Sequence, residues 1–169
     1  MNETKTTTGN LEFEEGERPT LPSGLNVLTI LTFVGSAFAL ITSIWGYTNA
    51  EKGYKQMVDS QAKMADAPAW AKSMMGPEMV EMAKKSVENK LPVLLLGIVA
   101  AALCIYGAIE MRKLKKQGFI LWLVGEILPI ITSVLFLGVG VFSGFGLIAL
   151  VVPIIFIILY AVQRKYLVY

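Results

Sequence analysis

Three long stretches of the chain carry no charged residue, and they constrain its fold more than any other feature. They are residues 19–50, 91–109 and 127–163. A helix needs about 20 apolar residues to cross the roughly 30 Å hydrocarbon core of a bilayer. The first two stretches each hold one crossing, and the third, with the residues before it, holds two. The predicted spans cover about residues 25–47, 91–109, 119–141 and 147–162.

The composition supports helices in lipid rather than a water-soluble domain. Hydrophobic residues make up 54% of the chain and charged residues only 17%, against about 45–50% and about 25% in soluble proteins. The strands of a membrane barrel would show alternating polarity, whereas these runs are continuously apolar. We therefore predict an all-α integral membrane protein, a four-helix bundle whose partner is the lipid bilayer.

The segments outside the predicted spans are polar. Residues 1–20 form an acidic tail that offers too little apolar surface to fold, so we expect it to be disordered. Because this start is acidic rather than basic, we expect no cleaved signal peptide. Residues 21–169 form a single membrane domain. Its loop, residues 48–90, shows the periodicity of two amphipathic helices, the second beginning at Pro77.

A cluster of basic residues lies between the second and third predicted spans. It consists of Arg112, Lys113, Lys115 and Lys116. Such a cluster attracts anionic lipid head groups, at about 1 kcal/mol per basic residue, or it serves only as a topology signal. By the positive-inside rule it places both termini in the cytoplasm. The net charge of +2 is small and spread along the chain, so we expect no nucleic-acid partner.

Glu126 is the single charge within the predicted spans, and it is the strongest candidate for a functional residue. A charge in mid-bilayer costs about 2.5–3.5 kcal/mol, so such residues face the bundle interior. Pro129 follows and leaves the Gly125 carbonyl without its helical partner. The pair could bind a cation or relay a proton. The alternative is structural, with Glu126 hydrogen-bonded to a polar side chain of another span. The candidates are Asn26, Tyr106 and Tyr160, and Lys115 or Lys116 at the near surface is a further alternative.

Other residue types narrow the chemistry. The chain has no histidine and one cysteine, which removes the commonest metal ligand and general base. We interpret Cys104 as a small core residue, and we expect no metal, cofactor or catalytic residue. Six methionines lie in the loop and favour a face that contacts lipid or a partner. They are Met57, Met64, Met74, Met75, Met79 and Met82.

Small residues recur four positions apart on the first two predicted spans. Gly35 and Ala39 form one such pair, and Gly97 and Ala101 form the other. Small side chains let helix backbones approach closely in membranes. We expect these faces to pack within the chain, with a seam between copies of the chain as the alternative.

The first span and its approach carry a resemblance. The stretch Arg18-Pro19-Thr20-Leu21-Pro22, continued by Asn26 to Ser36, resembles the start of small, uncharacterised four-span bacterial inner-membrane proteins. The resemblance implies an inner-membrane location. It implies no catalytic or binding residue.

Two functions remain open on these patterns. The first is a non-catalytic accessory or scaffolding protein that contacts a membrane-protein partner, or a second copy of itself, through the loop. The second is a small-solute or ion transporter or channel subunit with Glu126 in the path. A membrane-embedded enzyme comes last, since no set of acid, base and nucleophile is visible. A polar cavity reaching Glu126 would favour transport, and a dry bundle would favour the structural role.

Overall fold

The computed structural model describes residues 20–63, 68, 77–142 and 145–169, and this part of the chain is helical with no strand. The all-α prediction is therefore confirmed for these residues. The predicted tail lies outside them, apart from residue 20. The α-helices are α1 (Ser23–Lys63), α3 (Pro77–Glu88), α4 (Lys90–Arg112), α5 (Lys116–Leu137) and α6 (Phe145–Gln163). Two 3-10 helices also lie in this described part, η2 (Val139–Phe142) and η3 (Arg164–Tyr166).

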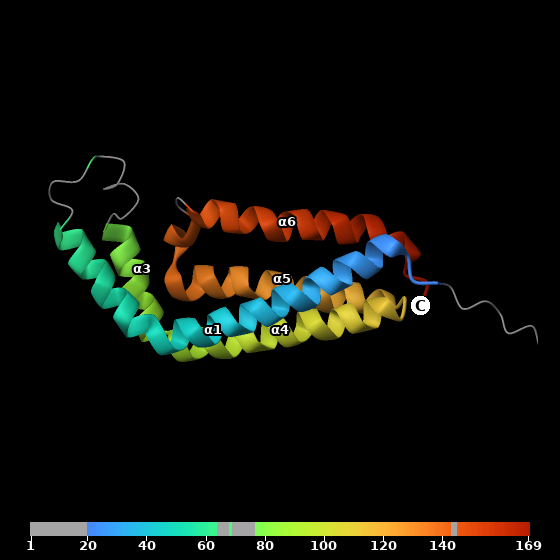
Figure 1. Ribbon diagram of the computed structural model, residues 1–169, viewed down its shortest axis with the longest axis horizontal. Helices are drawn as coiled ribbons and strands as arrows, with labels where there is room; N and C mark the ends of the chain where they lie inside the picture. The colour runs from blue at the N-terminus through green and yellow to red at the C-terminus, as the bar shows by residue number, and fades with distance from the viewer. Residues whose placement is uncertain (1–19, 64–67, 69–76, 143–144) are drawn as a thin grey trace, which may run out of the picture.

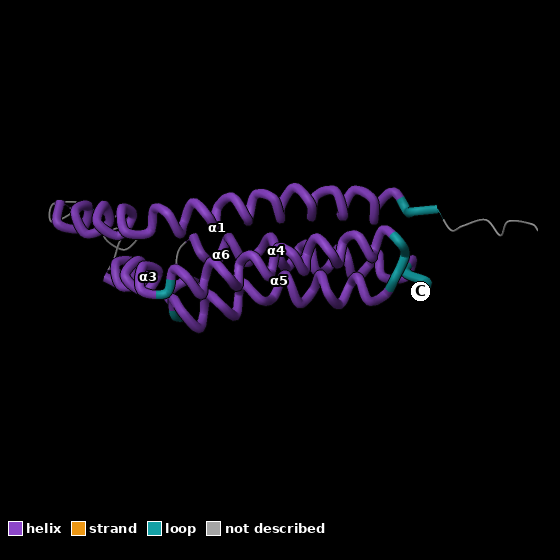
Figure 2. The backbone as a smooth tube through the Cα atoms, turned by 90° about the horizontal axis from the view of Figure 1, so that it is seen from below, coloured by secondary structure: helices purple, strands orange, loops and turns teal. Residues whose placement is uncertain are grey.

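Four of these helices run side by side along the length of the molecule, and successive ones point in opposite directions (Figure 1, Figure 2). They are α1, α4, α5 and α6. The start of α1, the turn between α4 and α5, and the C-terminus all lie at the same end. Three of the helices, α1, α4 and α5, are long and apolar enough to cross a membrane.

The first helix is longer than the sequence led us to expect. We predicted a span ending near residue 47 and a separate amphipathic helix after it, but α1 continues unbroken for 41 residues to Lys63. At 1.5 Å per residue it is about 60 Å long, twice the hydrocarbon thickness. The side chains of Thr48 and Asn49 bond to the Trp45 carbonyl within the same helix. The hydrogen-bonding groups of these polar side chains therefore find partners within α1, and the helix does not end there.

The second predicted loop helix is present and begins at Pro77 as expected. This helix, α3, lies at one end of the molecule beside the last part of α1 (Figure 1). We call residues 48–63, which continue α1 past the predicted end of the span, its projecting part. The Lys90 ammonium group at the start of α4 pairs with the Glu51 carboxylate of α1 at 2.8 Å. The ion pair ties the projecting part of α1 to the start of α4.

The third predicted span ends earlier than residue 141. Helix α5 stops at Leu137 because Gly138 adopts a φ of 92°, a conformation that side chains disfavour and glycine tolerates. The Gly138 N–H donates to the carbonyls of Ser133 and Val134 and so caps the helix. Between α5 and α6, Ser143 and Gly144 lie outside the described residues.

Helices α4 and α5 pack closely through glycine. A Cβ atom at Gly107 would lie 2.5 Å from the Trp122 backbone nitrogen, and one at Gly118 would lie 2.5 Å from the Met111 nitrogen. The sequence analysis did not single out these two glycines.

The two small-residue faces that the sequence predicted have different outcomes. On the second span Ala101 is buried, and a Cβ atom at Gly97 would lie 3.0 Å from the Ser43 hydroxyl oxygen of α1, so this face packs within the chain as expected. On the first span Gly35 and Ala39 are exposed, and a Cβ atom at Gly35 would meet nothing within 4 Å, so the expectation of packing within the chain is wrong there.

The aromatic core lies beside the contact between α4 and α5. Trp122 is almost fully buried, and its ring lies 4.2 Å from that of Tyr160 and 6.2 Å from that of Phe119, measured between centroids. Since Trp122 belongs to α5 and Tyr160 to α6, this stack holds α6 against the rest of the molecule at the end nearest the C-terminus.

Candidate functional site

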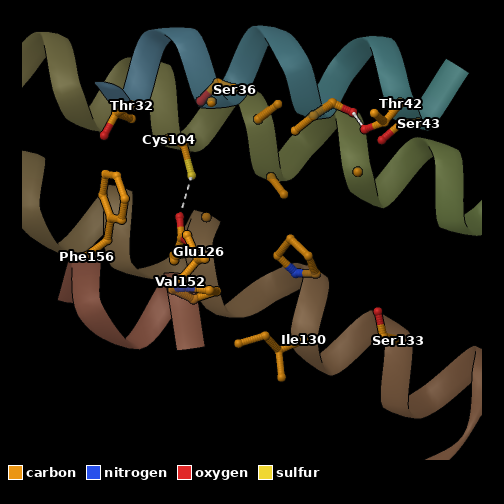
Figure 3. A pocket seen from close by; sticks show the side chains of 18 of the residues that line it. Thr32, Ser36, Thr42, Ser43, Cys104, Glu126, Ile130, Ser133, Val152 and Phe156 are labelled. Carbon is orange, nitrogen blue, oxygen red and sulfur yellow. Dashed lines mark hydrogen bonds between the residues drawn. The ribbon is translucent and has the colours of Figure 1, made fainter. Parts of the chain in front are cut away.

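A cavity of about 490 Å³ lies between α1, α4, α5 and α6. Its volume is in the range of small-molecule sites. Figure 3 shows Glu126 on its wall, with Thr32 and Phe156 toward one end and Ser43 and Ser133 toward the other. The polar groups that line it are Thr32, Ser36, Thr42, Ser43, Cys104, Glu126 and Ser133. The rest of the lining is mainly aliphatic, aromatic and proline side chains.

The Glu126 carboxyl group has one close polar contact among the described residues. The Cys104 thiol lies 3.8 Å from the Glu126 Oε2 atom (Figure 3), and a thiol is a weak hydrogen-bond donor. No lysine or arginine is among the described residues that line the cavity. The carboxyl group therefore reaches the cavity with neither a basic partner nor a strong hydrogen-bond donor.

The local sequence explains how Glu126 reaches this position. A Cβ atom at the preceding residue, Gly125, would lie 2.7 Å from the Cys104 sulfur and 2.8 Å from the Ala100 carbonyl oxygen. Only glycine lets α5 come this close to α4, and the approach brings Cys104 and Glu126 together. Pro129 lies within α5 and lines the same cavity. The structure thus brings together two of the predicted site residues, Glu126 and Pro129.

The three predicted hydrogen-bond partners of Glu126 lie elsewhere. Asn26 accepts a hydrogen bond from Arg112 at 2.8 Å. The Tyr160 hydroxyl group bonds to the Thr32 hydroxyl group at 2.7 Å. Tyr106 is more than half exposed. The structure therefore does not show the hydrogen bonds that a purely structural role for Glu126 was expected to make.

A row of hydroxyl groups on α1 forms the opposite wall, and the sequence analysis missed it. Thr32, Ser36 and Ser43 lie on one face of the helix and line the cavity. Their spacing of four and seven residues was a usable signal, because residues so spaced share a helix face. Ser36 is buried although it lies within an apolar run, which indicates that this face is turned toward the other helices.

The basic cluster between α4 and α5 is held by partners within the chain. Glu110 is 5% exposed. Its carboxylate forms ion pairs with the ammonium groups of Lys113 at 2.8 Å and Lys115 at 2.6 Å. The hydrogen bond to Glu110 raises the pKa of Lys113. The sequence analysis ended the second span at residue 109 and so passed over this carboxylate.

The other two cluster residues also have internal partners. Arg112 donates to Asn26 and to the Thr29 hydroxyl group, which joins α4 to α1. The Lys116 ammonium group donates to the Val168 carbonyl at 2.9 Å. Each residue predicted to meet lipid head groups thus makes a contact that stabilises this end of the molecule.

Comparisons with models of protein families, with curated proteins and with solved structures find no match to this chain.

Three of the six loop methionines, Met64, Met74 and Met75, lie outside the described residues. The cavity around Glu126 is therefore the feature from which a function can be inferred.

Proposed function

We propose that the chain is a four-span protein of a bacterial inner membrane, with α6 as its fourth crossing and both termini in the cytoplasm. Helix α6 has 19 residues and no charge, and it would extend about 28 Å, close to the hydrocarbon thickness. The basic turn between α4 and α5 lies at the end that holds the C-terminus (Figure 1). The positive-inside rule assigns that end to the cytoplasm.

Within this frame the chain acts as a small-solute transporter subunit that binds a small organic cation at Glu126. The observation that carries the proposal is an acidic side chain on the wall of a 490 Å³ interhelical cavity whose described lining has no basic residue. An unpaired carboxylate at membrane depth is costly, and a cation with an apolar periphery would offset that cost. The function requires binding and passage of the solute, with no covalent chemistry.

The lining favours an organic cation over a bare metal ion. Calcium needs about six to eight oxygen ligands, and magnesium binds through carboxylates and retained waters. No cluster of three or more metal-binding side chains occurs among the described residues. The Phe156 ring and the proline and aliphatic walls suit alkyl groups around a nitrogen. The hydroxyl groups of Ser36 and Ser43 suit any N–H or water that accompanies the cation.

Uptake by reconstituted protein tests the proposal. We expect proteoliposomes with an interior-negative potassium diffusion potential to take up radiolabelled tetramethylammonium faster than empty liposomes. The Glu126→Gln variant should fall to the rate of empty liposomes, because it keeps the size of the side chain and loses its charge. The matched control is Glu88→Gln, which alters an exposed carboxylate on α3 and should keep the wild-type rate.

An accessory or scaffolding role is the second candidate, and a specific observation favours it. The last part of α1 projects beyond the length needed for a span and lies beside α3 (Figure 1). This pair of helices offers a surface for a membrane-protein partner or a second copy of the chain. The uptake experiment separates the two candidates, since a scaffolding protein reconstituted alone would move no tetramethylammonium in either the wild-type or the variant form.

A further inference from the structure

The cavity opens sideways, between α1 and α6. Among its lining residues, Leu31 of α1 is 47% exposed and Val152 of α6 is 54% exposed. Gly35, Ala39 and Thr42 also line the cavity and are exposed. A residue that both lines a cavity and is exposed marks its mouth. By this criterion the mouth lies along α1, which supplies most such residues, with Val152 of α6 and Pro129 of α5 also at its edge.

The mouth follows the axis of α1 within the predicted span. Leu31, Gly35 and Ala39 are four residues apart and therefore lie one above another on the helix. A Cβ atom at Gly35 would meet nothing within 4 Å, so the opening is unobstructed at its middle. All of these residues fall between positions 25 and 47, which places the mouth at the depth of the hydrocarbon.

The opening is bounded at one end by a contact between α1 and α6. The Thr32 and Tyr160 hydroxyl groups bond at 2.7 Å, and Tyr160 in turn stacks on Trp122. Figure 3 places Thr32 at one end of the cavity and Glu126 further along it. The route from Glu126 to the outside thus passes between α1 and α6, into lipid.

We propose that the cavity takes single-chain amphiphilic cations from the bilayer, with the ammonium group at Glu126 and the alkyl chain leaving between α1 and α6. This inference rests on the proposed function and names its substrate class. The carboxylate supplies the complementary charge for the head group. The mouth lies in hydrocarbon, where an alkyl chain is already dissolved and gives up no favourable environment on binding.

A competition assay in lipid nanodiscs tests the inference. Radiolabelled tetramethylammonium is bound to the protein and displaced by decyltrimethylammonium or by unlabelled tetramethylammonium. In the Gly35→Leu variant, whose new side chain would fill the mouth, we expect displacement by the decyl compound to weaken at least tenfold. Displacement by tetramethylammonium should change less than threefold, because that cation leaves no chain in the mouth.

The chain offers a matched control on the same helix. A Cβ atom at Gly46 also meets nothing within 4 Å, but Gly46 does not line the cavity, so Gly46→Leu should leave both displacement curves as in wild type. Val152→Trp narrows the mouth from the α6 side and should repeat the Gly35→Leu result. This second mouth variant keeps the test valid if the Gly35→Leu protein misfolds.

The outcomes separate the two proposals. Loss of decyltrimethylammonium affinity in the two mouth variants alone supports lateral entry. Unchanged decyl displacement in both mouth variants overturns lateral entry and leaves the Glu126 site standing. If wild-type protein does not bind tetramethylammonium, the cation site itself is overturned, and lateral entry with it.

Discussion

Replacing Gly107 with alanine is expected to lower the free energy of unfolding by about 3 kcal/mol, at the upper end of the usual cost of overpacking. The added Cβ would lie 2.5 Å from the Trp122 nitrogen and 2.7 Å from the Gly118 carbonyl oxygen. Both are backbone atoms, so no side-chain rotation can relieve the clash, and α4 and α5 must move apart. Unfolding in mixed micelles, followed by tryptophan fluorescence, measures the effect.

The control for this prediction is Gly46→Ala in α1. A Cβ there meets nothing within 4 Å, and alanine is favoured over glycine in a helix by about 0.5–1 kcal/mol. We expect this variant to match or slightly exceed wild-type stability. Equal unfolding midpoints for the two alanine variants would contradict the close approach of α4 and α5.

Replacing Trp122 with alanine is expected to cost about 4 kcal/mol, the usual range for removing a large aromatic side chain from a core. Trp122 is 1% exposed and contacts the rings of Tyr160 and Phe119. Its loss leaves a void beneath Tyr160 and removes a contact that holds α6. We therefore expect increased proteolysis of α6 as well as lower stability by chemical denaturation.

Trp45 provides the matched control for this change. It is 70% exposed, so Trp45→Ala removes the same side chain without opening a void. We expect its unfolding free energy to stay within about 1 kcal/mol of wild type. A cost for Trp45→Ala equal to that for Trp122→Ala would show that the aromatic stack is not the core of the molecule.

The helical content and the positions of the apolar helices were predictable because lipid demands long runs without charge. The length of α1 was not predictable, since the polar residues after position 47 are amphipathic whether the helix continues straight or bends onto the membrane. Whether such a segment bends onto the membrane or continues straight depends on what packs against it, here α3 and the pair Glu51–Lys90. The end of α5 depends on the backbone angle of Gly138.

Glu126 could be singled out because a charge within an apolar run is visible in the sequence. Its surroundings could not, because they depend on how four helices are rotated about their axes. The hydroxyl groups of Ser36 and Ser43 join the cavity only because that face of α1 turns inward. Glu110 was passed over because it lies at the edge of an apolar run, where charged residues are usually at the surface. In the structure it is buried beside Lys113 and Lys115.

Equilibrium binding of tetramethylammonium to the purified protein in lipid nanodiscs tests the central claim most directly. We predict one saturable site per chain in wild type and affinity weaker by about tenfold or more in Glu126→Gln, equivalent to about 1.4 kcal/mol or more. Glu88→Gln should bind as wild type does. Saturable binding of equal affinity in Glu126→Gln and wild type would contradict the assignment of Glu126 as the cation site.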